Sequence, residues 1–354
     1  MPTRRRNRWQ VAAERVAAAI PRSRLHPKVL KWAGACDEAP WAVAFSGGAD
    51  SLALLLLVWV HWPERRKSCR VLHFNHRLRG RAADADARFC RDVCAGLCVR
   101  LRGGAWKEAT ADASEAEARA ARRVFFGKEM ERAGARALWT GHQQDDIAET
   151  MLMRIARGSG TSGLAAPRPV QTMANGRVHV RPLLTLAKAE IEATLTAAGV
   201  RWRVDATNAE PLFLRNRMRS EVVPVWRAAV TGRDALAGAA LARQLIEEDD
   251  EAVEAWLDEL QVLGARGELR LRRLAGKPRG LVRRAVLRWL AHHGRAGNLS
   301  RQALEALLSD VARGRQTKHS VGTNALAVVG ARVAKIVIKT ENARGNSTVA
   351  PIDL

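Results

Sequence analysis

One stretch of this sequence constrains its fold more than any other: Trp41-Ala-Val-Ala-Phe-Ser-Gly-Gly-Ala-Asp-Ser-Leu-Ala-Leu-Leu-Leu-Leu57. It predicts a short buried strand over Ala42–Phe45, then a tight loop of small residues, then an apolar helix. The adjacent glycines let the backbone turn sharply and approach a ligand. The free amides at the start of the helix are a natural seat for phosphate. We therefore expect a phosphate-binding loop made of Ser46, Gly47, Gly48, Ala49, Asp50 and Ser51.

The spacing of this loop sets it apart from the commonest phosphate loops. It matches neither the Walker pattern GxxxxGK[ST] nor the dinucleotide pattern GxGxxG. A glycine-rich turn that binds nothing is the alternative interpretation. The full SGGxDS pattern between a strand and a helix favours the phosphate site.

Strands and helices alternate after this loop. Further strands are predicted at 70–74, 99–101 and 136–140, and helices at 82–98, 114–133 and 145–155. This alternation predicts an α/β fold with a parallel sheet covered on both faces. Ligands of such folds bind beyond the carboxyl ends of the strands, and residues 46–51, 73–79 and 141–146 all fall at that edge.

The chain is long enough for two domains. We predict a basic N-terminal arm without order at 1–35, the α/β domain at 36–228, a basic and mostly helical domain at 229–340, and a disordered tail at 341–354. Residues 158–181 are rich in Gly and Pro and are predicted as a loop. The second domain is expected to hold helices near 234–258, 277–293 and 300–312, followed by three short strands.

The formal net charge of +23 favours a polyanionic partner, because neutralising phosphates releases counterions and steers encounter. Nucleic acid is the leading partner, and the phosphate contacts are expected from Arg272, Arg273, Lys277, Arg279, Arg283, Arg284 and Arg288. A charged face that only keeps the protein soluble is the alternative. No apolar run is long enough to span a bilayer, so no membrane partner is predicted.

Five cysteines, an odd number, argue against a disulfide framework and for a reducing compartment. We therefore expect the protein in the cytoplasm. Cys90, Cys94 and Cys98 lie one helical turn apart. Because no CxxC pair accompanies them, we interpret them as small apolar packing residues rather than metal ligands.

A second polar segment, Gly141-His-Gln-Gln-Asp-Asp-Ile-Ala-Glu-Thr150, follows a predicted strand at the ligand edge. Its acidic residues could cap the next helix. Beside a phosphate loop that carries Asp50, they also suit two chemical tasks. Paired carboxylates hold Mg²⁺ through oxygen and accept a proton from a nucleophile. We expect Asp50 and Asp146 to be the catalytic pair and the ligands of Mg²⁺.

Several motifs in consistent order resemble the tRNA(Ile)-lysidine synthases, which are PP-loop (N-type) ATP pyrophosphatases of the adenine nucleotide alpha hydrolase-like fold. The resemblance covers about residues 40–226, and residues 230–340 are a weaker match. The motifs are the SGGADS loop, His73-Phe-Asn-His-Arg-Leu-Arg79, Glu115-Ala-Glu-Ala-Arg-Ala-Ala-Arg122, GHQQDDIAETMLMRIARGSGTSGL, Val180-Arg-Pro-Leu-Leu184, Asp205-Ala-Thr-Asn208 and Leu214-Arg-Asn-Arg-Met-Arg219.

The resemblance implies a reaction with two steps. ATP adenylates the C2 oxygen of the wobble cytidine in the isoleucine tRNA with anticodon CAU, and the ε-amine of free lysine then displaces AMP to leave lysidine. It implies ATP and Mg²⁺ as cofactors, extends the ATP site to His73 and His142, and matches Arg217 to a family arginine at the substrate. A homodimer is also compatible with the resemblance. Another PP-loop enzyme acting on tRNA, such as a 2-thiolase, and an RNA-binding protein with an inactive ATP site are the alternatives.

Two residues depart from the family pattern. Gln143 stands where a second histidine is usual, and Arg123 stands where a tyrosine is usual. Neither is one of the carboxylates, so we expect the departures to affect nucleotide packing rather than the reaction.

Overall fold

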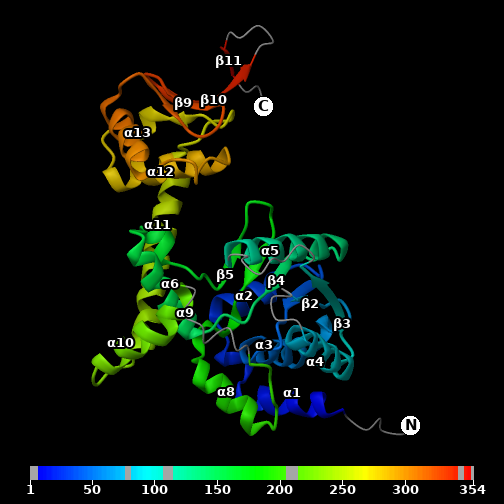
Figure 1. The fold of residues 1–354 in the computed structure, drawn as a ribbon. Helices are drawn as coiled ribbons and strands as arrows, with labels where there is room; N and C mark the ends of the chain where they lie inside the picture. Colours follow the sequence, from blue (N-terminus) through cyan, green and yellow to red (C-terminus); the bar gives the residue numbers. More distant parts are fainter. Residues whose placement is uncertain (1–6, 76–80, 107–114, 205–213, 342–346, 352–354) are drawn as a thin grey trace. The chain divides into compact units, whose positions relative to one another are not determined.

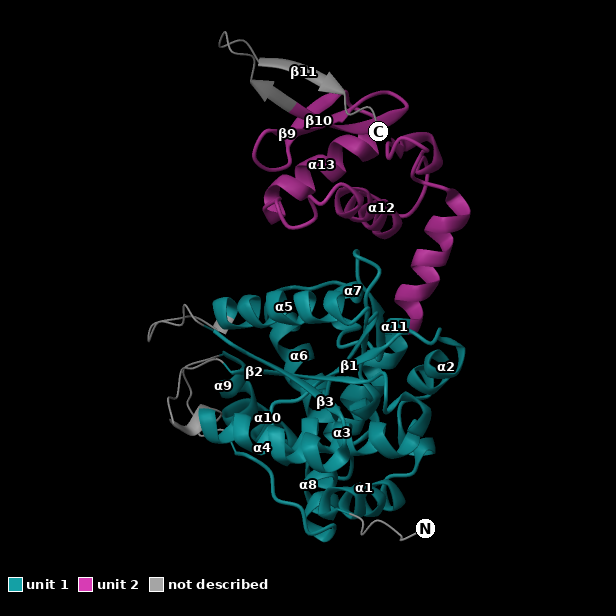
Figure 2. Cartoon of the chain, turned by 90° about the vertical axis from the view of Figure 1, so that its right-hand side faces the viewer, with its two compact units in different colours: residues 1–247 teal, residues 248–354 magenta. Residues whose placement is uncertain are grey.

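The computed structural model describes residues 7–75, 81–106, 115–204, 214–341 and 347–351. The chain forms two compact units, residues 1–247 and 248–354 (Figure 2). Their boundary falls within one long helix, α11 (Ala235–Leu260), rather than at the predicted position 228. A helix break does lie next to the predicted boundary, because α10 (Val223–Ala229) ends there and Gly232 has a left-handed conformation. The units divide further along the chain, since a continuous run of good helix formers carries α11 past residue 247.

Unit 1 is built on a six-stranded sheet in the order β3-β2-β1-β4-β6-β5. Every pair is parallel except β5 with β6. The order reverses between β1 and β4, which makes this the switch point where open α/β sheets bind ligands. The strands are β1 (Trp41–Ala44), β2 (Arg70–Asn75), β3 (Arg100–Ala105), β4 (Ala137–Trp139), β5 (Val170–Thr172) and β6 (Val178–Val180).

Helices cover both faces of this sheet, which confirms the predicted fold class (Figure 1). Side chains alternate along β1, so Trp41 and Val43 enter a large core with α1, α3, α4 and α8, whereas Ala42 packs under α5. Trp41 and Trp139 lie with ring centroids 4.5 Å apart at the centre of the large core. The helices are α3 (Ala49–His61), α4 (Arg81–Leu97), α5 (Glu115–Arg132), α6 (Gln144–Ala156), α7 (Thr161–Leu164), α8 (Lys188–Ala197), α9 (Leu214–Arg217), α10 (Val223–Ala229) and the short turns η1 (Arg22–Arg24), η2 (Pro63–Arg65), η3 (Pro182–Thr185) and η5 (Met218–Val222).

The predicted N-terminal arm is wrong for residues 8–35, which form α1 (Arg8–Ala19) and α2 (Pro27–Ala35). Trp9, Val16 and Ile20 are buried in the core of unit 1. The arm was predicted from Met1-Pro-Thr-Arg-Arg-Arg6, which lies outside the described residues. The chain that follows carries apolar side chains at helical spacing, and their burial stabilises α1. The predicted loop at 158–181 also contains structure, because β5 and β6 extend the sheet there.

Unit 2 combines helices with an antiparallel sheet. Its helices confirm the predicted ones closely, but the sheet is larger than predicted. β11 pairs with β10, so the predicted disordered tail is wrong for residues 347–351. The elements are the end of α11, β7 (Leu269–Arg270), η6 (Leu271–Arg273), α12 (Arg279–His292), α13 (Arg301–Arg313), β8 (Thr317–Ser320), β9 (Ala325–Val329), β10 (Val333–Glu341) and β11 (Ser347–Pro351).

Two of the three helical cysteines are packing residues, as predicted. Cys90 and Cys94 are buried against the sheet, and burial raises the pKa of both thiols. Cys98 differs, because α4 ends at Leu97 and Cys98 takes a left-handed conformation that leaves it exposed. Among the described helices, none combines the length and the apolar character that crossing a membrane requires.

Candidate functional site

The loop at residues 46–51, here called the phosphate loop, follows β1 at the switch point of the sheet. Its two serines hold its shape, because their hydroxyl oxygens lie 3.0 Å apart and Ser51 also donates to the Gly48 carbonyl at 3.0 Å. Gly47 has φ +93°, a conformation that only glycine adopts without strain. No side chain among the described residues caps α3, so its first amides stay available to an anion.

Gly141 brings the second motif against this loop. A Cβ atom on Gly141 would lie 2.8 Å from the Asp50 carbonyl oxygen and 3.0 Å from the Ser51 nitrogen. Any larger residue would therefore push the two segments apart. The sequence analysis quoted Gly141 only as the start of a motif. A glycine directly after a strand at the ligand edge is the signal that could have identified its role.

Asp50 is a carboxylate with an unsatisfied atom. Its Oδ1 atom is buried and has no hydrogen-bond partner among the described residues. Burial, together with the charge of Asp146, raises the pKa of Asp50 to about 7, and Lys188 and Arg219 oppose this shift. An orphaned carboxylate oxygen fits a site for a hard cation such as Mg²⁺.

Asp146 is hydrogen-bonded to the residue that caps its own helix. Its Oδ2 atom accepts a hydrogen bond from the Gln143 amide at 3.0 Å, and the Gln143 side chain caps α6 in return by accepting from Asp145. The unusual Gln143 is thus a fully buried helix cap. Asp145 caps a different helix, because it accepts from the Lys188 amide at the start of α8. Asp146 therefore belongs to the site and to the scaffold at once.

Two buried carboxylates and two partly buried arginines form a cluster around Asp146 that was not predicted from the sequence. Arg215 lies 2.5 Å from Asp146 and 2.8 Å from Glu149. Arg219 lies 2.6 Å from Glu149 and 3.4 Å from Asp146. Glu149 is only 1% exposed, so these ion pairs are shielded from water. We name this set, Asp146, Glu149, Arg215 and Arg219, the charge cluster.

Arg217 lies apart from these contacts. It is exposed on α9 and makes no ion pair or hydrogen bond with a described residue. Arg215 and Arg219 are four residues apart and share a helix face, whereas Arg217 is displaced from that face. The role of Arg217 stays a prediction. The i, i+4 spacing of its neighbours is the signal that could have identified them.

The two predicted nucleotide-site histidines are held near the loop by hydrogen bonds. His73 Nδ1 lies 2.9 Å from the Phe45 carbonyl, and its Nε2 is buried without a partner in the described structure. His142 Nδ1 lies 2.9 Å from Thr140 Oγ1. Burial lowers the pKa of both, and that of His142 well below its usual range, with Arg181 adding to the effect. Both rings are therefore neutral at pH 7. The rest of the His73 motif, residues 76–79, and the segment 205–208 lie outside the described residues.

The arginines predicted to contact RNA fall into two groups. Arg279 forms an ion pair with Glu305 and Arg288 forms one with Asp258. Arg284 forms ion pairs with Asp250 and Glu254. Arg272, Arg273 and Arg283 are exposed and make no ion pair with a described residue, so they are the freer cations. Lys277 lies over the Trp256 ring, 5.8 Å from its centroid.

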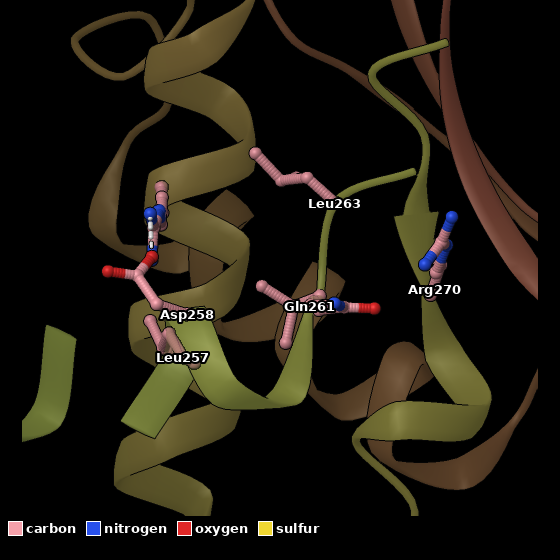
Figure 3. A pocket seen from close by; sticks show the side chains of 7 residues that line it. Leu257, Asp258, Gln261, Leu263 and Arg270 are labelled. Atoms are coloured by element: carbon pink, nitrogen blue, oxygen red, sulfur yellow. Dashed lines mark hydrogen bonds and ion pairs between the residues drawn. The ribbon is translucent and has the colours of Figure 1, made fainter. Parts of the chain in front are cut away.

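A cavity of about 330 Å³ opens in the same unit (Figure 3). Asp258, Gln261 and Arg270 line it together with apolar side chains. Asp258 and Arg288, which also lines the cavity, are already paired with one another. No residue of the phosphate loop or of the charge cluster belongs to its wall.

The fold and the site together define a PP-loop nucleotide-binding domain. The family model of the PP-loop domain matches residues 21–226, and ATP is the nucleotide this family uses. A tRNA(Ile)-lysidine synthase from Rhodopseudomonas palustris is 36% identical over 275 residues, which are 75% of this chain and 78% of that protein. The chain belongs to the tRNA(Ile)-lysidine synthase family of PP-loop proteins.

Two further relatives match about half of this chain. The synthase of Geobacter sulfurreducens is 43% identical over 187 residues, 51% of this chain and 39% of its own length. That of Symbiobacterium thermophilum is 42% identical over 51% of this chain and 38% of its own length. The chain thus matches about two fifths of the length of these two relatives.

Proposed function

We propose that this chain joins lysine to C2 of the wobble cytidine in the isoleucine tRNA with anticodon CAU. The C2 oxygen attacks the α-phosphorus of ATP and releases pyrophosphate. The lysine ε-amine then attacks C2, and the C–O bond breaks to release AMP. The observation that carries the proposal is the meeting of Asp50 and Asp146 at the phosphate loop, in a chain of this family.

The first step needs a seat for the triphosphate. The amides of the phosphate loop and of the first turn of α3 suit that task. The neutral rings of His73 and His142 suit contacts to uncharged parts of the nucleotide, because they add no charge at pH 7.

The second step needs a lysine amine that has lost its proton. The free amine has a pKa near about 10.4, so a base must accept its proton. Asp50, with its pKa raised to about 7, is a better proton acceptor than an ordinary aspartate. Asp146 supplies negative charge that attracts and orients the ammonium group before this transfer.

Mg²⁺ fits the site through the orphaned Oδ1 of Asp50. Asp146 fits the ion less well than predicted, because the Gln143 amide and Arg215 already occupy its oxygens. When bound, the ion would neutralise phosphate charge. Lysine as the amine donor, the tRNA, the cytoplasmic location and a homodimer remain proposals.

The experiment is to incubate the protein with unmodified isoleucine tRNA, ATP, Mg²⁺ and labelled lysine. We expect lysine in the tRNA and equal amounts of pyrophosphate. Asp146→Asn should lower turnover by about 10²-fold, the scale of lost orientation, because the ammonium group loses the charge that positions it. Asp145→Asn is the matched control, because the Asp145 carboxylate lies next to Asp146 in the chain but caps α8. If pyrophosphate is released but no lysine enters the tRNA, another PP-loop reaction is favoured. If neither pyrophosphate nor lysine-labelled tRNA forms, an RNA-binding protein is favoured.

A further inference from the structure

Arg203 is attached to the phosphate loop from outside it. Its backbone amide donates to the Gly47 carbonyl at 2.9 Å. Its Cγ atom would lie 3.3 Å from a Cβ atom on Gly47, so the side chain passes directly over the glycine. The sequence analysis gave Arg203 no role, because it precedes the Asp205 motif instead of belonging to it.

The guanidinium of Arg203 is held by one of its three nitrogens. Nε donates to Asp86 Oδ1 at 2.6 Å, and Asp86 is a buried residue of α4. The Arg203 side chain is 40% exposed. Its two Nη groups make no hydrogen bond within the described structure. The Nη groups are therefore held in a fixed orientation and can donate hydrogen bonds to a ligand.

We infer that Arg203 binds the pyrophosphate portion of ATP at the phosphate loop and that Asp86 is its positioning residue. This inference rests on the proposed function in that ATP is the ligand. The loop itself contains no lysine or arginine, although splitting ATP develops charge on the leaving pyrophosphate. A guanidinium fixed at Nε presents its Nη groups in a plane that matches phosphate oxygens.

The test is calorimetric binding of inorganic pyrophosphate and of AMP to the full chain. Arg203→Gln keeps the backbone bond to Gly47 but removes the cation. It should weaken pyrophosphate binding by about tenfold to a hundredfold, the scale of a charge-assisted hydrogen bond. AMP binding should not change. Asp86→Asn should weaken pyrophosphate binding less, and Arg203→Lys should restore part of it.

Arg201→Gln is the matched control, since Arg201 is an exposed arginine two residues away and makes no hydrogen bond or ion pair within the described structure. Unchanged pyrophosphate binding in Arg203→Gln would reduce Arg203 to a backbone anchor and overturn the inference. Equal weakening of AMP and pyrophosphate would indicate a distorted loop and would also overturn it, as would a wild-type protein that binds no pyrophosphate. Pyrophosphate binding that depends on Arg203 in a protein that incorporates no lysine would refute the proposed function alone.

Discussion

Asp50 illustrates what single residues contribute and what sequence alone can predict about them. Its place after two glycines made it a predicted site residue, but its raised pKa depends on burial and on Asp146, which is far away in the chain. Gln143 and Arg215 make the same point. Gln143 departs from a family pattern yet is a buried cap, and Arg215 meets Asp146 only because α9 packs on α6. Residue types and spacing predict membership of a site, whereas contacts across the fold set the charge state.

The raised pKa of Asp50 predicts a specific dependence of stability on pH. The folded protein holds this proton more tightly than the unfolded chain, so stability falls as the pH rises from about 4 to about 7. Asp50→Asn removes that loss. Without ligands, the melting temperature of the variant should therefore be higher than that of the wild type at pH 8. This difference in melting temperature should vanish near pH 4. Asp249→Asn, at an exposed position, is the control for a lost surface charge. A difference that does not depend on pH would show that Asp50 is ionised normally.

The helices show which elements sequence can predict. The α6, α12 and α13 helices follow clear apolar periodicity, and their bounds agree with the predicted ones within a few residues. Side-chain caps also mark the starts of α6 and α13. The α1 helix was not predicted, because the predicted arm rested on the arginines that precede this helix and not on its apolar stripe. Short strands such as β5 and β6 carry too little pattern of their own, and their place depends on the sheet they extend.

The packing of α9 and η5 on α6 depends on the charge cluster. Glu149→Gln would remove a buried carboxylate and leave Arg215 and Arg219 with Asp146 as their remaining partner in the charge cluster. Removing one partner of a buried ion pair costs about 3–5 kcal/mol. We expect a loss of unfolding free energy of that size in urea denaturation. Glu259→Gln, at an exposed position of α11, should change it by less than about 0.5 kcal/mol. A Glu149→Gln variant as stable as this control would show that the cluster does not hold the helices together.

At the scale of the whole molecule, two units and a strong positive charge were predictable from length and composition. The boundary between the units was not, because it falls inside the continuous helix α11. The role of each arginine was not predictable either, since ion pairs such as Arg284 with Asp250 form between helices far apart in the chain.

We expect Arg272, Arg273 and Arg283, which are exposed in unit 2, to contact tRNA phosphates. The triple variant Arg272→Gln, Arg273→Gln and Arg283→Gln should weaken tRNA binding. It should also reduce the slope of log affinity against log salt by about 2, because each lost phosphate contact contributes about 0.7 to 0.9. The same three-charge change at Arg301, Arg313 and Arg315, which are also exposed, is the control. Equal slopes for wild type and both variants would mean that the positive face only keeps the protein soluble.

Locating the product on the tRNA would test lysidine formation by this chain. After reaction with ATP, Mg²⁺ and lysine, unmodified isoleucine tRNA with anticodon CAU can be digested and its nucleosides analysed by mass spectrometry. We predict lysine joined to the wobble cytidine and to no other nucleoside, and about a hundredfold slower product formation when Asp146 is replaced by Asn. A sulfur-containing wobble nucleoside, or tRNA that is bound but unmodified, would contradict the account.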